Sequence, residues 1–146
     1  MTLRTTQSLQ FVNKDPMGHN PKLNPVENAA VCALLPPTVD VTHHLAVSEP
    51  IPVSANCNID PWMRGWLIVQ DHPYMAVSDA DGKFTIKNLP VGAATFRIWH
   101  EQAGFVRTIK RDEKTIALAK GKLAQTIRAG DNDLGQIRIS RELIKR

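Results

Sequence analysis

The sequence has few cysteines and few aromatic residues: 2 Cys, 3 Trp, 1 Tyr and 4 Phe among 146 residues. With two cysteines, the chain can form at most one disulfide, and it contains no C-x-x-C pair. So few aromatic side chains cannot provide the stacking positions that often accompany a nucleic-acid surface. We therefore expect a domain that binds no nucleic acid.

Several sequence signals are also missing. Apolar runs such as residues 29–35 stop at prolines, well short of a membrane span, and residues 1–7 lack the apolar core of a signal peptide. The chain contains no Walker loop, no G-x-G-x-x-G and no H-E-x-x-H. No serine or cysteine nucleophile stands in a recognisable catalytic arrangement. These absences favour a role that is not enzymatic.

The charge is unevenly distributed. Residues 1–104 carry seven Lys and Arg against nine Asp and Glu, whereas residues 105–146 carry eleven against five. The basic charges of the second segment alternate with apolar residues, as in Thr108-Ile-Lys-Arg. This pattern is typical of the solvated face of a β-sheet.

The sequence predicts an all-β fold. Apolar and polar residues alternate over short stretches that Pro, Gly and Asn interrupt, which favours a β-sandwich over βαβ units. In the first half, residues 28–34 could instead form a short helix. The expected strands cover residues 2–12, 39–47, 51–55, 65–70, 76–78, 83–87, 94–100, 105–110, 114–119, 124–128 and 134–140.

A hairpin is expected around Asp79-Ala-Asp-Gly82, because Asp-Gly suits a tight turn. Residues 88–92 form a second predicted turn. The carboxylates of Asp79 and Asp81 are spaced as in a calcium loop, but the rest of such a loop is absent, so we assign them to the turn. Period-two alternation predicts a core for the second half that consists of Phe84, Ile86, Leu89, Phe96, Ile98, Trp99 and Ile137.

One motif suggests a function. The segment Cys57-Asn-Ile-Asp-Pro-Trp-Met63 lies between two predicted strands. Its spacing resembles Cys-x-x-His-x-x-Met, the ligand loop of the cupredoxins, which are blue-copper electron carriers. The surrounding text, including Asp71-His-Pro-Tyr, Trp99-His-Glu and residues 11–20, is similar to secreted bacterial proteins related to methylamine-utilisation proteins. In that family, a cupredoxin-like domain runs into a β-sandwich like the regulatory domain of carboxypeptidases.

The resemblance implies a metal site and a division of the chain. His19, Cys57 and Met63 match three copper ligands, and Asp60 stands where the family has its second histidine. It also implies a cupredoxin-like domain over residues 1–70 without its first strands, and a transthyretin-like sandwich over 71–146. The family suggests an exported protein, periplasmic or secreted, that has a redox protein as its partner. The open sheet edge left by missing strands could pair two copies into a dimer.

Other assignments for the same residues stay open. A Cys32–Cys57 disulfide in an oxidising compartment would remove the thiolate ligand. Either His43 or His44 could supply the missing imidazole, but adjacent side chains on a strand point to opposite faces. Cys57 and Met63 could also be ordinary core residues, and Asp60 could cap its own loop.

Three further groups could bind a ligand or form structure. His72 and the pair His100-Glu101 could form an acid–base pair or a second metal site, or they could hydrogen-bond between strands and anchor the junction between the two modules. Trp62, Trp66 and Trp99 could form a sugar-binding platform, or they could belong to the core. The sequence thus predicts a copper-binding or electron-transfer module with an altered ligand set. Its alternative is a metal-free structural module that binds carbohydrate or protein.

Overall fold

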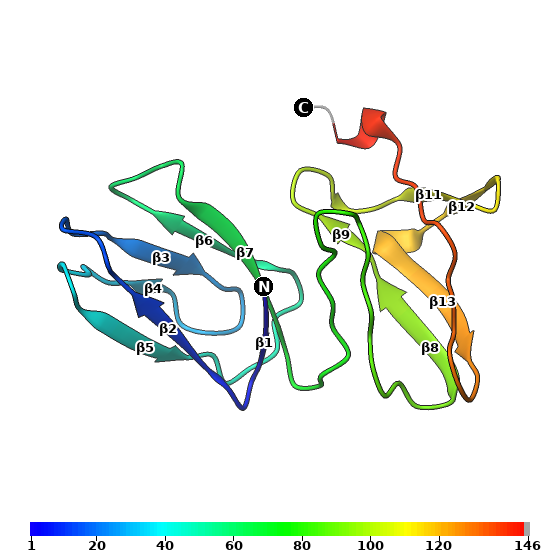
Figure 1. Cartoon of the computed structure of the whole chain (residues 1–146), viewed down its shortest axis with the longest axis horizontal. Helices are drawn as coiled ribbons and strands as arrows, with labels where there is room; N and C mark the ends of the chain where they lie inside the picture. Colours follow the sequence, from blue (N-terminus) through cyan, green and yellow to red (C-terminus); the bar gives the residue numbers. More distant parts are fainter. Residues whose placement is uncertain (145–146) are drawn as a thin grey trace. The chain divides into compact units, whose positions relative to one another are not determined.

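The structure is a computed structural model that describes residues 1–144, and it contains β-strands joined by turns and two short 3-10 segments (Figure 1). The all-β prediction is confirmed. The chain divides into two compact units, Met1–Lys87 and Asn88–Arg146. The segment 71–87, which the sequence analysis grouped with the second half, belongs to the first unit.

The first unit contains a five-stranded sheet with the order β1-β7-β6-β3-β4. β1 runs parallel to β7, and the other neighbouring pairs are antiparallel. A separate antiparallel ribbon joins β2 to β5. The strands are β1 (Thr2–Arg4), β2 (Ser8–Val12), β3 (Pro21–Asn24), β4 (Val31–Cys32), β5 (Asp40–His44), β6 (Val53–Cys57) and β7 (Arg64–Gln70).

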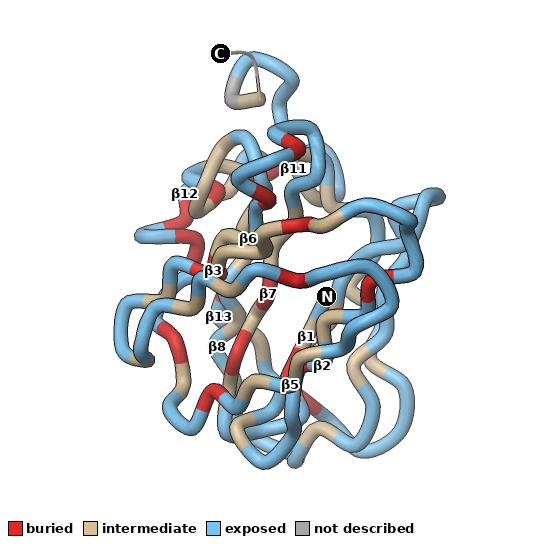
Figure 2. Tube along the Cα trace, turned by 90° about the vertical axis from the view of Figure 1, so that its left-hand side faces the viewer, coloured by how far each residue is buried: buried red, intermediate tan, exposed pale blue. Residues whose placement is uncertain are grey.

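Both sheets of this unit contribute to one apolar core. Along β7, Leu67 and Val69 are buried while the residue between them is less so, as period-two alternation requires. Figure 2 colours the buried residues of the chain red. Leu9 from the β2–β5 ribbon belongs to the same core, so the ribbon packs on the five-stranded sheet. The full set of buried core residues is Leu3, Leu9, Leu23, Leu45, Val53, Leu67 and Val69.

The second unit consists of three antiparallel pairs, β8 with β13, β9 with β10 and β11 with β12. Its buried core is Val106, Ile109, Leu118 and Leu123, with Ile98 and Ile137 packed against it. The strands are β8 (Gly92–Arg97), β9 (Trp99–His100), β10 (Gly104–Phe105), β11 (Thr108–Arg111), β12 (Lys114–Ala117) and β13 (Lys122–Ile127). The 3-10 segment η1 (Ala119–Gly121) links β12 to β13, and η2 is Arg141–Leu143.

The predicted hairpin around residue 79 is only partly present. Its turn exists, because Asp79 N donates to the carbonyl of Lys83 and Gly82 N donates to that of Asp79. Within the described chain, however, residues 71–91 form no strand. Phe84 is 47% exposed, so its predicted place in the core is wrong. Alternation gives a strand one apolar face, but that face is buried only if a ladder partner and a second layer are present.

Two other local predictions also differ from the structure. Residues 28–34 contain the strand β4 and no helix. The segment is extended because Val31 and Cys32 pair with β3, and the side chain of Asn28 ties its start to the backbone of Val47. The expected strand over residues 134–140 is reduced to a bridge between Lys110 and Arg138. No helix among the described residues is long and apolar enough to cross a membrane.

Candidate metal centre

Three side chains with different ligand atoms meet inside the first unit. The imidazole of His19, the sulfur of Cys57 and the carboxylate of Asp60 each offer one atom within 4.8 Å of the other two. All three residues are less than a tenth exposed, at 8%, 7% and 7%. A buried histidine, cysteine and carboxylate rarely gather without a structural or chemical role, because each loses hydration there.

Strand pairing brings His19 to Cys57. His19 lies just before β3 and forms a bridge with Leu35, with N···O distances of 2.9 and 2.7 Å. Two residues later, Pro21 pairs with Cys57, the last residue of β6. The antiparallel register therefore places the side chain of residue 19 beside a sulfur that is 38 positions away in the sequence.

The loop from Cys57 to Met63 is closed by its own backbone. Cys57 N donates to the carbonyl of Met63 at 3.0 Å, and Met63 N donates to the carbonyl of Asp60 at 2.9 Å. A further bond from Asn58 N to the carbonyl of Asn20 ties the loop to the segment that carries His19. This closure turns residue 60 back towards the sulfur, so Asp60 Oδ2 lies 3.8 Å from Cys57 Sγ.

The sulfur of Cys57 accepts hydrogen bonds from backbone N–H groups. Asp60 N donates to it at 3.4 Å and Asn20 N at 3.5 Å. Burial by itself raises the pKa of the Cys57 thiol, but the N–H donors, together with His19, outweigh burial and lower that pKa below its ordinary value. The environment thus favours the thiolate, the form that binds metal ions.

Both ring nitrogens of His19 face carboxylates. Nε2 lies 2.8 Å from Asp15 Oδ2, and Nδ1 lies 2.7 Å from Asp60 Oδ2. The hydrogen bond to Asp15 is the largest cause that raises the pKa of His19, followed by Cys57, while burial opposes the rise. Without a metal ion, both ring nitrogens of His19 therefore have a carboxylate partner.

Asp15 is the residue that the sequence analysis missed. It occupies the outer nitrogen of His19 and so leaves Nδ1 directed at Cys57 and Asp60. A carboxylate on the far nitrogen of a ligating histidine fixes its tautomer and orientation in many metal sites. The spacing of four residues between Asp15 and His19 was the available signal. Both residues lie in a loop, however, where spacing alone does not determine which side chains are in contact.

We predict that Asp15→Asn weakens Cu²⁺ binding about tenfold, because the amide retains an acceptor but loses the charge that supports the imidazole. Isothermal titration calorimetry of the reduced protein measures this. Asp71→Asn changes an exposed carboxylate of the same unit and is expected to leave the affinity unchanged. Equal affinities for wild type and Asp15→Asn would contradict the role assigned to Asp15.

The donor set fits a metal ion after small movements. The contacts of the sulfur with Nδ1 and Oδ2, 4.0 and 3.8 Å, are close to the separations between ligands of one ion. The 2.7 Å contact between Nδ1 and Oδ2 must open to about 3.3 Å for tetrahedral bonds of about 2 Å. Any proton on Nδ1 would have to leave before a metal ion could bind there.

Met63 ends the same loop but does not share the burial of the other three residues. It is 44% exposed, and its neighbours Trp62 and Ile59 are 77% and 50% exposed. Of the other two tryptophans, Trp66 lies on β7 of the same unit and Trp99 lies on β9 of the second unit.

The two cysteines are free, and the topology keeps them apart. Cys32 lies on β4 and Cys57 on β6, the two strands that flank β3. Two strand spacings put their Cα atoms roughly 10 Å apart, beyond the reach of a disulfide. Instead, Cys32 Sγ donates to the side-chain oxygen of Asn20 at 3.2 Å.

The other histidines lie outside the cluster. His44 Nε2 contacts the carbonyl of Thr5 at 2.7 Å, and His43 packs edge-on against Phe11 with ring centres 5.7 Å apart. His72 and His100 each accept a bond from the backbone two residues later, at 3.2 Å.

The carboxylates of the turn at residue 79 also have local partners. Asp79 Oδ1 accepts from the backbone N–H groups of Asp81 and Lys83. The Asp81 carboxylate lies 3.8 Å from the Lys83 ammonium. These contacts account for both acidic side chains as parts of a turn.

Comparisons with protein-family models, with curated proteins and with solved structures found no match to this chain.

Proposed function

We propose that the first unit is a cupredoxin-like copper-binding module, without enzymatic activity, whose altered ligand set is His19, Cys57 and Asp60, with Met63 as a weak fourth ligand. The observation that supports this most strongly is the convergence of a buried sulfur, imidazole and carboxylate from segments 38 residues apart. A thiolate, an imidazole and a weak thioether are the donors of blue-copper sites.

The position of the donors agrees with this proposal. Cys57 and Asp60 come from a closed loop between the adjacent strands β6 and β7, and His19 comes from the start of the neighbouring strand β3. The resemblance noted in the sequence suggests an exported protein, periplasmic or secreted, that exchanges electrons with a redox protein. In this proposal, Asn88–Arg146 is a sandwich like the carboxypeptidase regulatory domain.

A second function is favoured by a specific observation. The 2.7 and 2.8 Å contacts of His19 with Asp60 and Asp15 satisfy the imidazole without any metal ion. The cluster could therefore act as a purely structural polar core in a module that binds carbohydrate or protein. The two functions differ in whether copper binds to Cys57.

Titration of the reduced protein with Cu²⁺, followed by visible absorption and electron paramagnetic resonance, separates them. We expect one Cu²⁺ per chain and a charge-transfer band from the thiolate that is weak or distorted, since Asp60 replaces an imidazole donor. Cys57→Ser is expected to remove the band, and the matched variant Cys32→Ser to keep it. A thiol count after removal of the metal checks that Cys57 was not simply oxidised.

An unchanged spectrum on Cu²⁺ addition, with Cys57 still reduced, would contradict the copper function and leave the structural module. A band that survives in Cys57→Ser would show that copper binds elsewhere on the chain.

A further inference from the structure

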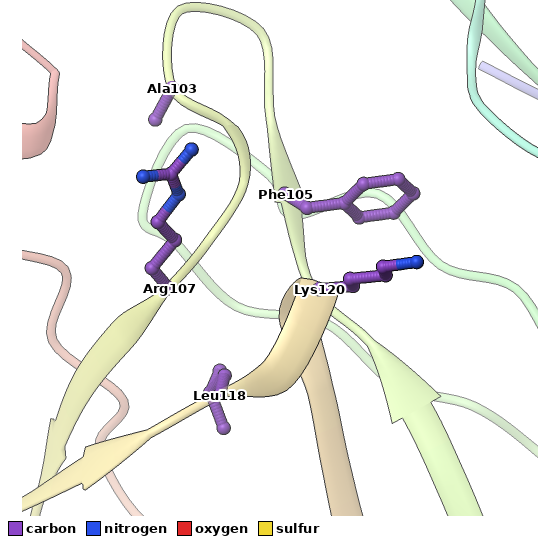
Figure 3. Close-up of a pocket in the computed structure, with 5 residues that line it drawn as sticks. All are labelled: Ala103, Phe105, Arg107, Leu118 and Lys120. Carbon is purple, nitrogen blue, oxygen red and sulfur yellow. The ribbon is translucent and has the colours of Figure 1, made fainter.

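A surface cavity of about 410 Å³, partly open to solvent, lies on the second unit. Figure 3 shows the five residues that line it: Ala103, Phe105, Arg107, Leu118 and Lys120. They come from the β9–β10 turn, from β10, from the segment before β11 and from the residues around η1.

The charged residues of this lining have one sign. Arg107 and Lys120 are both basic, and no acidic residue lines the cavity. Among the residues that the structure describes, no carboxylate lies within 4.0 Å of either side chain's charged nitrogens. The guanidinium of a third basic residue, Arg97, lies over the Phe105 ring, 5.1 Å from its centre. The local potential therefore favours an anion.

The rest of the lining is apolar. Leu118 is 5% exposed and belongs to the core of the unit, and Phe105 and Ala103 are half-buried. In Figure 3 the Phe105 ring and the Lys120 side chain point the same way, whereas Arg107 extends towards Ala103. A ligand with both an apolar body and a negative group would match this lining.

The backbone holds the lining in place. Lys120 has φ 51° and ψ 40°, a left-handed conformation that is uncommon for a side chain of this size. At the next residue, Gly121, a Cβ atom would lie 2.6 Å from the carbonyl oxygen of Ile98 and 3.1 Å from the Phe105 ring, so glycine is required. Leu118 N donates to the carbonyl of Arg107 at 2.7 Å, which joins the two sides of the cavity. The contacts around Gly121 and Leu118 thus hold the left-handed backbone of Lys120, which places this residue in the lining of the cavity.

We propose that this cavity binds a small organic oxyanion, with its apolar body against Phe105 and Leu118 and its negative group attracted by the positive charges of Arg107 and Lys120. The ligand is a carboxylate or a phosphate monoester that carries an aromatic or aliphatic group. This assignment gives a specific role to part of the basic excess of residues 105–146, and it does not depend on the copper site.

Nuclear magnetic resonance titration of the full chain with three probes tests the proposal. Benzoate and phenyl phosphate carry the negative group, and benzyl alcohol is the neutral control. We expect at least one anion to shift the backbone amides of residues 103–107 and 118–121, and benzyl alcohol to bind about tenfold more weakly. The anion with the higher affinity identifies the carboxylate or the phosphate class.

Two variants and one control locate the binding. Lys120→Asn removes the charge and suits the left-handed backbone, and Arg107→Gln removes the second charge at an exposed position. Each is expected to weaken anion binding about fivefold, as the loss of a partly exposed ion pair does. Lys114→Gln changes an exposed charge on β12 outside the cavity and is expected to leave binding unchanged.

The proposal is overturned if neither anion shifts these amides. It is also overturned if benzyl alcohol binds as tightly as the anions, or if Lys114→Gln weakens binding as much as the two lining variants.

Discussion

Asp60→His is expected to give a copper complex with a clear blue colour and at least tenfold higher affinity than that of the wild type. The Asp60 carboxylate lies 3.8 Å from Cys57 Sγ and 2.7 Å from His19 Nδ1, so a side chain at this position reaches the same ion as the other two. An imidazole there would complete two nitrogens and a thiolate around copper, the donor set of blue-copper centres. The carboxylate oxygen is a harder donor that favours a more tetragonal geometry.

Visible absorption and electron paramagnetic resonance of the Cu²⁺ complex measure this change, and competition with a chelator of known affinity gives the binding constants. Asp60→Asn is the matched control, because it removes the charge without adding an imidazole and is expected not to gain the blue colour. Circular dichroism establishes that each variant is folded. A folded, reduced Asp60→His protein that stays colourless with Cu²⁺ would contradict the copper function. A wild-type complex that is already blue would contradict the effect assigned to Asp60.

The sequence predicted part of the candidate site and missed part of it for a physical reason. The spacing of Cys57, Asp60 and Met63 within one loop limits how far apart their backbones can be. His19 was assigned by resemblance, and the structure places it beside Cys57 through the pairing of Pro21 with Cys57. Asp15 could not be found in this way, because two side chains four positions apart in an irregular loop have no fixed relation in space.

The fold shows the same limit. Alternation located β7 and β13 to within a few residues, because a strand with one buried face needs that pattern. The same pattern around Phe84 led to a wrong prediction, since an apolar face without a ladder partner stays exposed. The core residues Val106 and Leu118 lie next to turns, and only the pairing of β11 with β12 reveals that they share an interior.

A buried carboxylate outside the candidate site explains how the first unit holds the turn after β3. Glu49 is 2% exposed. Its two oxygens accept hydrogen bonds from the backbone N–H groups of Val26, Glu27 and Asn28, at 2.7 to 3.2 Å. The side-chain amide of Asn28 donates to Glu49 as well, at 2.7 Å. One carboxylate thus satisfies most donors of the turn and fixes it to the segment before β6.

These hydrogen bonds require the ionised form of Glu49. Burial alone raises the pKa of its carboxyl group, but the donors from Asn28, Val26 and Glu27 outweigh burial and hold that pKa below the ordinary value of 4.5. Below pH 4.5 the unfolded chain therefore binds this proton more readily than the folded chain does. The contribution of Glu49 to stability is complete above this pH and is lost as the pH falls through the pKa of the folded state.

Glu49→Gln is expected to lower the free energy of unfolding by about 3 kcal/mol at pH 7, because it replaces a charged acceptor by an amide that faces buried N–H donors. Urea denaturation at pH 7 and at pH 3 measures the effect, and the difference between wild type and variant should shrink at pH 3. Glu27→Gln changes an exposed carboxylate in the same turn and should cost less than about 0.5 kcal/mol. The folded Glu49→Gln variant should still bind Cu²⁺ as the wild type does, since the turn follows β3 and His19 precedes it. A cost that is equal at both pH values would show that the charge of Glu49 does not hold the turn.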